Sequence, residues 1–555
     1  MNSHHSPCRL DPNFRQSAAN KVQTPLALLP FVSPIIPSRP PIFHFLHVAI
    51  FRKLLQLFSV AMVVVIIGLG LLWMKNPDSI SPQAWQHVSS IWSGQTDLLA
   101  NRTPGELIRY FKRRLEGHPN LEMLAKPPLH WLQTHYERVV PPGPLPHLGK
   151  GQQPSPLPAL SYGVTGQPME VKPDGVPVET LLDVHTQDLT VDSVDSLLKA
   201  TAQARPGQTI TIAPGTYVLK SPINTKAAGN QFQPIILRAA QPGQVTLEVD
   251  TEVAVRVAHP YWMFENLRMR GICKDHLNCE HAFHIFGAAQ NTVVRNNYLE
   301  DFNAHIKING AYRQWPDYGL IQYNTLTNNS RRETHVPVTQ VDLVGANHWR
   351  VLDNLVSNFV KGDGNMVSYG LFMKGASFGG RIERNLVICT PQDVSQPGVR
   401  VGISFGGGGT GKPYCRDLQC EKEHTAGMAA NNIVAHCNDF GIDVNHSSAI
   451  LIANNTLINT AGIDVRGDTA SARLYGNLLD GRIRQRDGGR IKQELNLIAH
   501  LPDVFDQADS LTMKWLNPPE NIPSLTLVPT DFAGSQRLDG TPPGASLDSP
   551  MPASK

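Results

Sequence analysis

Two near-copies of one short segment carry the first residues whose types and spacing could do chemistry. The segments read GIDVNH and GIDVRG, and they place Asp443 and Asp464 21 residues apart. On neighbouring strands the two carboxylates would lie one strand spacing apart, and their repulsion would raise the pKa of one of them. Such a pair could act as acid and base on a glycosidic bond, with the short separation of a retaining enzyme. The alternative interpretation is structural, with Asn445 and Arg466 neutralising the two charges.

These segments belong to a longer repeat that must position them. A motif of the form apolar–x–x–Asn–x–apolar recurs seven times, with gaps of 27, 30, 31, 47, 23 and 22 residues between its Asn residues. These are Asn297, Asn324, Asn354, Asn385, Asn432, Asn455 and Asn477. One coil of such a repeat cannot bury its own apolar face, so coils stack and share a core. We therefore predict an all-β fold, a right-handed parallel β-helix in which the Asn side chains form a hydrogen-bonded ladder.

A second short strand precedes each Asn motif and sets two columns of outward side chains. Its apolar residues alternate with others, so the apolar members point into the core and the rest point out. Successive coils stack these outward residues about 4.8 Å apart. The first column is His284, Lys307, Asp342, Phe372, Ser404, Asp443 and Asp464. The second column is Phe286, Asn309, Val344, Lys374, Gly406, Asn445 and Arg466.

Several residues of the two columns, or next to them, could bind an extended polar polymer. On this face Lys307 and Lys374 would both lie beside Asp342. Two cations next to one carboxylate suggest a binding site more than an ordinary solvent-exposed surface of mixed charge. The candidate substrate-binding residues here are Lys307, Asn309, Asp342, Asn445, His446 and Arg466. The alternative is an ordinary polar surface stabilised by pairs along the ladder.

Cysteine spacing predicts disulfides. Six of the seven cysteines lie in the repeat region, which is an even number. Cys273 and Cys279 are close enough to close a small loop, as are Cys415 and Cys420, which leaves Cys389 with Cys437. A zinc site is the alternative, although these spacings are poor zinc patterns.

The largest insertion fills the 47-residue gap and contains the pair Cys415 and Cys420. We expect a disulfide-pinned loop that overhangs the outward face. Its residues Glu421, Glu423 and His424 could supply polar groups or metal ligands there.

Composition and one apolar segment indicate what the protein does not bind and where in the cell it lies. Charged residues make up 17% of the 555 residues and the formal net charge is +3, which argues against a nucleic-acid-binding protein. Leu54–Met74 is 21 residues without a charge, enough to span about 30 Å as a helix. Arg52 and Lys53 precede it, so the positive-inside rule places everything after it across the membrane. A cleaved signal peptide and a buried globular helix are the alternatives.

The chain therefore divides into five predicted parts. Residues 1–53 are a cytoplasmic or mis-assigned N-terminal segment, and residues 54–74 are a transmembrane signal anchor. Residues 75–184 form a helical segment and a Pro/Gly-rich linker, residues 185–500 form the parallel β-helix, and residues 501–555 form a partly disordered tail. Ser193–Ala204 should be a short amphipathic helix that covers the open end of the first coil.

The opening of the repeat region resembles a known family. Ser193–Arg270 contains the runs ARPGQTITIAPGTYV, PIILRAAQPGQVTL and YWMFENLRM. They resemble the opening of the chondroitinase B-like and alginate-lyase β-helix family, which has a pectin-lyase-like solenoid. The resemblance implies cleavage of uronate polysaccharides by β-elimination, with calcium and a Lys base. The matching segment, NMVSYGLFMKGAS, places Lys374 on that Lys.

The departures from the family pattern are substantial. The two Glu that help bind calcium appear here as Val367 and Tyr369, so a calcium site of that type is not supported. The family's Arg-His-Gly in the next coil is missing, and Arg381, Arg384 and Arg400 are only loose substitutes.

These observations predict a membrane-anchored protein that acts on polysaccharide on the periplasmic side of the cell membrane. Lyase-type β-elimination with Lys374 as base is the leading activity. A non-catalytic glycan-binding or envelope scaffold protein is the first alternative, and a glycoside hydrolase using Asp443 and Asp464 is the second, so whether the chain is an enzyme stays open. No cofactor is predicted from the residues, and calcium enters only through the resemblance.

Overall fold

A computed structural model of the chain describes residues 187–391, 398–407, 410–506, 508, 511, 514–537 and 540–545, together with residue 127. The predicted membrane segment, residues 54–74, lies outside these residues, as do almost all of the predicted helical and linker region and all of the N-terminal segment. Within the described part of the chain, no helix combines the length and the apolar character needed to cross a bilayer.

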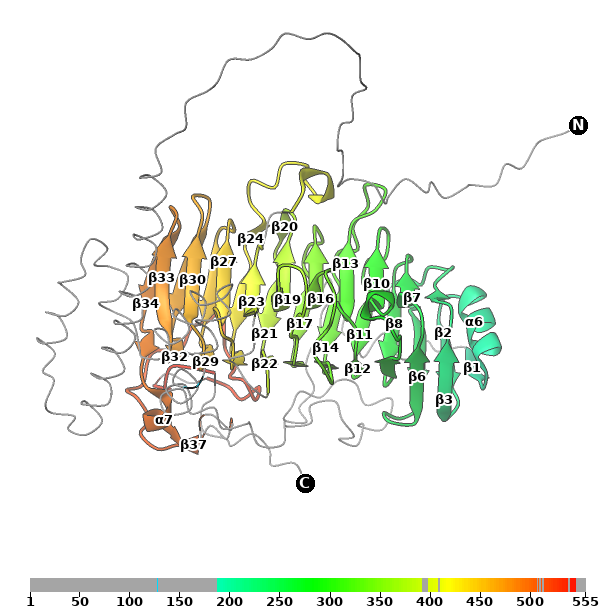
Figure 1. The fold of residues 1–555 in the computed structure, drawn as a ribbon, viewed down its shortest axis with the longest axis horizontal. Coiled ribbons are helices and arrows are strands. Elements are labelled where there is room, and N and C mark those ends of the chain that lie inside the picture. Colours follow the sequence, from blue (N-terminus) through cyan, green and yellow to red (C-terminus); the bar gives the residue numbers. More distant parts are fainter. Residues whose placement is uncertain are drawn as a thin grey trace, which may run out of the picture. The chain divides into compact units, whose positions relative to one another are not determined.

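The described residues form a solenoid of three long parallel sheets, which confirms the predicted all-β, parallel β-helix architecture. Each coil gives one short strand to each sheet in turn, and every strand pairs with the equivalent strand of the coils before and after it (Figure 1). We call the sheets I, II and III in the order in which the chain first enters them. The Asn motifs span sheets I and II, and the outward columns lie on sheet III.

Sheet I contains β1 (Gln187–Val191), β2 (Gln208–Ile212), β5 (Ile235–Ala239), β8 (Trp262–Glu265), β11 (Val293–Arg295), β14 (Leu320–Gln322), β17 (Arg350–Leu352), β21 (Arg381–Glu383), β25 (Met428–Ala430), β28 (Ile450–Ala453), β31 (Ser471–Tyr475) and β34 (Arg490–Glu494). Sheet II contains β3 (Gly215–Leu219), β6 (Val245–Val249), β9 (Arg268–Gly271), β12 (Tyr298–Glu300), β15 (Thr325–Thr327), β18 (Leu355–Ser357), β22 (Leu386–Ile388), β26 (Ile433–Ala435), β29 (Thr456–Ile458), β32 (Leu478–Leu479) and β35 (Leu497–Ile498).

Sheet III contains β4 (Ile223–Asn224), β7 (Val253–Val257), β10 (His281–Phe286), β13 (Ile306–Asn309), β16 (Val338–Val344), β19 (Val367–Lys374), β23 (Val399–Phe405), β27 (Ile442–Asn445), β30 (Gly462–Arg466) and β33 (Arg482–Arg486). Short elements complete the described residues: α6 (Val194–Ala202), η4 (His276–Asn278), β20 (Ser377–Phe378), η5 (Lys412–Tyr414), β24 (His424–Thr425), α7 (Leu501–Val504), β36 (Phe505–Asp506) and β37 (Lys514–Trp515).

The Asn ladder forms at the bend between sheets I and II. From Asn297 to Asn477, each side-chain amide donates to the Oδ1 of the next Asn along the solenoid at 2.9–3.0 Å, and Asn477 donates to Asn496 at 2.7 Å. The ladder therefore contains all seven predicted residues and one more. The residue before each Asn has a positive φ, as at Tyr323 (57°) and Arg384 (53°), which turns the chain sharply enough to bring the Asn inward.

One continuous hydrophobic core fills the solenoid, built from the inward members of the alternating strands. The helix α6 packs against the first strands of all three sheets, with Leu197 fully buried. The Ser193 hydroxyl accepts the Ser196 backbone N–H at 3.2 Å and begins the helix. The predicted short helix at this end of the solenoid is therefore confirmed.

The chain beyond β35 packs back onto the solenoid. A second apolar cluster joins Leu501, Phe505 and Phe532 to outward residues of sheet II, among them Leu386 and Ile388. Hydrogen bonds hold the same segment further along, since the Ala545 backbone N–H donates to the Thr456 hydroxyl at 2.8 Å. Where the sequence suggested a partly disordered tail, the described part of residues 501–545 covers one face of sheet II.

All three predicted disulfides are present. They are Cys273–Cys279, Cys389–Cys437 and Cys415–Cys420. Cys389 and Cys437 are fully buried and tie neighbouring coils together through the core, whereas the other two bonds close small loops.

Candidate functional site

The outer face of sheet III brings the predicted columns together. The strand registers pair each residue of the first column with the next, from His284 with Lys307 to Asp443 with Asp464. The second column follows the same registers from Phe286 to Lys374 and again from Asn445 to Arg466, while Gly406 lies just past the end of β23. Alternation with a period of two was enough to predict this arrangement.

Most of the first column is covered. Asp342 and Phe372 are each 4% exposed, and Ser404, Asp443 and Asp464 are fully buried. Outward positions on a strand are expected to face solvent, but here Lys307 pairs with Asp342, Arg466 with Asp443 and Arg486 with Asp464. Only the beginning of the column, with His284 and Lys307, remains partly open.

Lys374 ends β19 and lies over an aromatic ring. Its Nζ is 4.6 Å from the ring centroid of Phe372. Burial lowers the pKa of this ammonium below its usual value, and Lys307 lowers it further, while the carboxylates of Asp342 and Glu423 oppose the shift. A lysine with a lowered pKa can take up a proton as a general base, because more of it is neutral at a given pH.

An ion pair adjoins Lys374 on the preceding strands. Lys307 Nζ donates to Asp342 Oδ2 at 2.6 Å, while the buried Oδ1 of Asp342 has no hydrogen-bond partner among the described residues. One coil earlier, His284 Nε2 and Asn309 Oδ1 are 2.8 Å apart. An unpaired buried carboxylate oxygen is costly, so a donor from water or ligand is expected to reach it.

The Asp443 and Asp464 carboxylates are each held by an arginine. Arg466 donates from Nε to Asp443 Oδ1 at 3.0 Å and from Nη2 to Oδ2 at 2.8 Å. Arg486 donates from Nε to Asp464 Oδ2 at 2.9 Å, and its Nη2 lies 2.8 Å from the same oxygen. Burial still raises the pKa of Asp443 to about 6, against the opposing effect of Arg466. Arg466 is the partner that the structural interpretation named, whereas the second partner is Arg486 in place of Asn445. The hydrolase role of the pair stays a prediction.

Other predicted site residues lie elsewhere. Arg381 is on sheet I, where its Nε donates to Glu383 at 2.5 Å. Arg400 is the second residue of β23 and is 1% exposed, with its backbone N–H donating to the Asn438 side chain at 2.8 Å. His446 follows β27, with Nδ1 3.8 Å from Asp468. Arg381 thus lies on another sheet than Lys374, and Arg400 lies opposite Ser368, near the start of β19, whereas Lys374 ends that strand.

The insertion loop contributes one residue to the neighbourhood of Lys374. Glu423 is 6% exposed and accepts the Gly375 backbone N–H at 2.8 Å. His424 is fully buried, hydrogen-bonds Ser377 at 2.7 Å, and has a pKa lowered to about 3 by burial. Glu421 faces solvent. No cluster of metal-ligating side chains occurs among the residues that the structure describes.

Sequence reasoning missed Arg486, and a signal for it was present. The segment GRIRQR follows GIDVRG by one more coil, so the second column continues from Arg466 to Arg486. The Asn motif fades there, which is why the extra coil was overlooked, although Asn496 continues the ladder.

The residues at the calcium positions of the resembling family do not fit a calcium site. Val367 offers no side-chain oxygen, and the Tyr369 ring packs edge-on against Phe372 with centroids 5.3 Å apart. Calcium prefers six to eight oxygen ligands, which these side chains cannot supply.

The three parallel sheets define the chain as a parallel β-helix protein. Within that class, residues 191–363 match the family model of chondroitinase B, which covers less than half of the chain and ends before Lys374. The chain resembles that family in these coils. Among curated proteins, none has a sequence that matches this chain.

Solved structures whose backbones resemble this one include three lyases. Pectate lyase Pel9A shares 14% identity with a TM-score of 0.43, covering 67% of this chain and 90% of that one. A rhamnogalacturonan lyase shares 12% identity with a TM-score of 0.41, covering 66% and 97%. An alginate lyase from a Paenibacillus species shares 15% identity with a TM-score of 0.31, covering 56% and 99%.

Proposed function

We propose that the protein is a carbohydrate-active β-helix protein that cleaves a uronate polysaccharide by β-elimination, with Lys374 as the base. The match of residues 191–363 to the chondroitinase B family supports the carbohydrate as substrate class. The observation that carries the activity is the ammonium of Lys374, which lies on the outer face of sheet III with a pKa lowered by burial.

In this mechanism the neutral Lys374 amine removes the proton on C5 of a uronate residue. The electron pair of that C–H bond forms the C4–C5 double bond as the C4–O4 bond breaks. The leaving O4 takes up a proton, which the protonated Lys374 or water supplies. Lys307 retains donors beyond its bond with Asp342 and would stabilise the negative charge that develops on the uronate carboxyl group.

The test uses the full chain purified in detergent and a panel of uronate polymers. Elimination creates an unsaturated uronate that absorbs ultraviolet light. Lys374→Ala should abolish this signal. Lys374→Arg keeps the positive charge but cannot act as the base, so it should abolish the signal as well. No signal with any polymer from folded protein would refute the lyase. Binding retained in Lys374→Ala would favour the glycan-binding scaffold, and new reducing ends without a double bond, lost in Asp443→Asn, would favour the hydrolase.

We also propose that Leu54–Met74 anchors the chain in the cell membrane with the β-helix on the periplasmic side. The support is the uncharged 21-residue run and the preceding Arg52 and Lys53. The protein should stay in the membrane fraction after alkaline carbonate washing. The β-helix should resist external protease in intact cells and be cut only after the outer envelope is opened. Release by carbonate would refute the anchor.

A further inference from the structure

The insertion between β23 and β24 runs back along the solenoid. We call residues 406–423 the strap; its residues 408 and 409 lie outside the described chain. In Figure 1 it is the yellow loop that rises beyond the end of β23, next to β20. Its fixed points are backbone and side-chain contacts with earlier coils.

Arg416 fixes the strap to two preceding coils. It donates from Nη1 and Nη2 to the two oxygens of Asp317 at 2.7 and 2.9 Å, and from Nη1 to the Gly345 carbonyl at 3.1 Å. Its guanidinium also lies over the ring of Trp315, 4.9 Å from the centroid. A bidentate pair that is also stacked on an aromatic ring holds one geometry, which a single ion pair on the surface does not.

The strap also binds both backbone groups of Gly375, the residue after Lys374. The Gly375 N–H donates to Glu423 Oε2 at 2.8 Å, and the Gly375 carbonyl accepts the Arg416 backbone N–H at 2.9 Å. The Lys374 carbonyl accepts the Gly345 N–H at 2.8 Å. The peptide group that joins Lys374 to Gly375 is therefore fixed from the earlier coil on one side and from Glu423 on the other.

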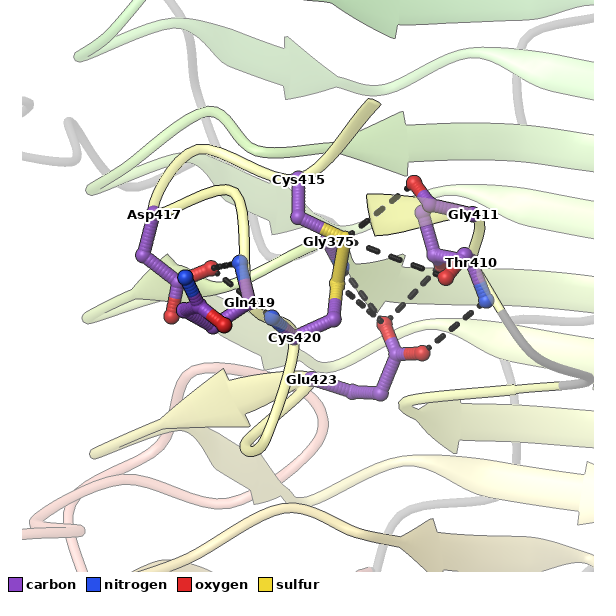
Figure 2. The surroundings of a disulfide bond; sticks show 8 residues. All are labelled: Gly375, Thr410, Gly411, Cys415, Asp417, Gln419, Cys420 and Glu423. Carbon is purple, nitrogen blue, oxygen red and sulfur yellow. Dashed lines mark hydrogen bonds between the residues drawn. A yellow bond between two sulfur atoms is a disulfide. The ribbon is translucent and has the colours of Figure 1, made fainter. Parts of the chain in front are cut away.

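Glu423 is itself well placed by neighbours within the strap. Its carboxylate accepts the Thr410 N–H at 3.1 Å and the Thr410 hydroxyl at 2.9 Å, as Figure 2 shows. The Cys415–Cys420 disulfide closes the loop immediately before it (Figure 2). All of these donors are neutral groups, so none of them brings a positive charge to the buried Glu423 carboxylate. Lys374 is one of the groups that feels this charge.

We propose that Glu423 is a positioning residue for Lys374, fixing the Lys374–Gly375 peptide and with it the place of the amine on the outer face of sheet III. The proposal rests on the proposed function, in which that amine is the base. A second effect follows from the charge, because Glu423 and Asp342 raise the pKa of Lys374 while burial and Lys307 lower it. Glu423 thus sets where the amine lies and contributes to the pH at which it becomes neutral.

The test measures Lys374 directly and does not depend on turnover. Lysines of the full chain are dimethylated with a ¹³C label, and the Lys374 resonance, assigned by its loss in Lys374→Arg, is titrated by NMR. Glu423→Gln should lower the pKa of Lys374 and so move its titration to lower pH, because a nearby negative charge is removed. The control is Glu421→Gln, which removes an equal charge two residues earlier from a solvent-facing side chain and should leave the titration where it was.

Where elimination is observed, Glu423→Gln should shift the acid limb of the kcat profile to lower pH by the same amount, with KM little changed. A lowered melting temperature with an unmoved Lys374 titration would mean a merely structural role and would overturn the proposal. If Glu423→Gln does not fold, Glu423→Asp keeps the charge and withdraws it from Gly375. It must then change the Lys374 chemical shift, and an unchanged shift would again overturn the proposal. If no polymer is cleaved, the titration still decides the role of Glu423 separately from the lyase.

Discussion

The Asn ladder makes a prediction whose size can be worked from its hydrogen bonds. Asn385 is fully buried in the middle of the ladder. Its amide donates to Asn432 Oδ1, the Val351 carbonyl and the Glu383 carbonyl at 2.8–3.1 Å. Its Oδ1 accepts both the backbone N–H and the side-chain amide of Asn354 at 3.0 Å. Asn385→Ala removes all five bonds at once.

The cost follows from what is left unpaired. The Asn354 backbone N–H loses its acceptor inside the core, which costs about 1–3 kcal/mol, and each remaining lost bond adds about 0.5–1.5 kcal/mol at most. Some of these partners retain other bonds, since the Asn354 amide still reaches the Ile321 carbonyl. We therefore expect Asn385→Ala to lower the free energy of unfolding by about 3–5 kcal/mol.

The matched control is the last rung. Asn496 is partly exposed, accepts from Asn477 and donates to the Leu474 carbonyl at 3.1 Å. Water can replace these bonds, so Asn496→Ala should cost about 1 kcal/mol. Asn385→Asp should cost more than Asn385→Ala, because it buries a charge and removes the donors.

The assay is urea unfolding followed by tryptophan fluorescence, with hydrogen exchange of the Asn354 amide as a local probe. Solenoids can unfold in parts, so the local probe guards against a misleading single midpoint. Equal costs for Asn385→Ala and Asn496→Ala would refute the idea that the ladder, and not the coil packing, carries this stability.

Three other outcomes are expected. Lys374→Met should raise the free energy of unfolding at neutral pH, because burial disfavours the charged form of Lys374 in the folded state. The gain should vanish as the pH rises above 10.5, as thermal unfolding across pH would show. Removing Cys389–Cys437 with paired Ala substitutions should lower the free energy of unfolding by about 4 kcal/mol, and removing Cys273–Cys279 by about 2 kcal/mol. The first disulfide spans 48 residues and the second 6, so the first restricts the unfolded chain more. Equal losses of stability in urea unfolding would contradict this chain-entropy argument. Stability should fall as the pH drops from 6.5 towards 4, because the unfolded chain binds protons at histidines that burial keeps neutral in the folded protein. An unchanged melting temperature across that pH range would refute this prediction. These histidines, with pKa values of about 3, 4 and 3, are His281, His305 and His424.

The sequence predicted what is periodic. Side-chain direction in a strand has a period of two and the coil-to-coil step is fixed, so Asp443 opposite Asp464 could be read from two near-copies of one segment. The Asn repeat located the bend between sheets I and II for the same reason. Disulfide pairing followed from short spacings and one remaining pair.

What the sequence did not predict depends on contacts that have no period. Arg416 lies 99 residues from Asp317, and nothing local in the chain indicates that the two meet. The structural interpretation of the Asp pair named Arg466, which does donate to Asp443. It did not include Arg486 on Asp464 or the full burial of both carboxylates, because a pattern of outward positions does not show what covers them. The packing of Phe505 and Phe532 onto sheet II was also missed, because that segment has neither repeat nor alternation.

The bond between Arg416 and Asp317 has a consequence for how the solenoid comes apart. A stack of coils behaves as a one-dimensional array in which each unit feels only its nearest neighbours, so a break can open between any two of them. The strap adds a link that skips over neighbours, from the coil of β23 to the coil that holds Asp317. The coils between these two points cannot separate in sequence without first releasing that link. They should therefore open as one cooperative block, with similar hydrogen-exchange rates from β14 to β23, while the coils before β14, which the strap does not reach, fray one at a time.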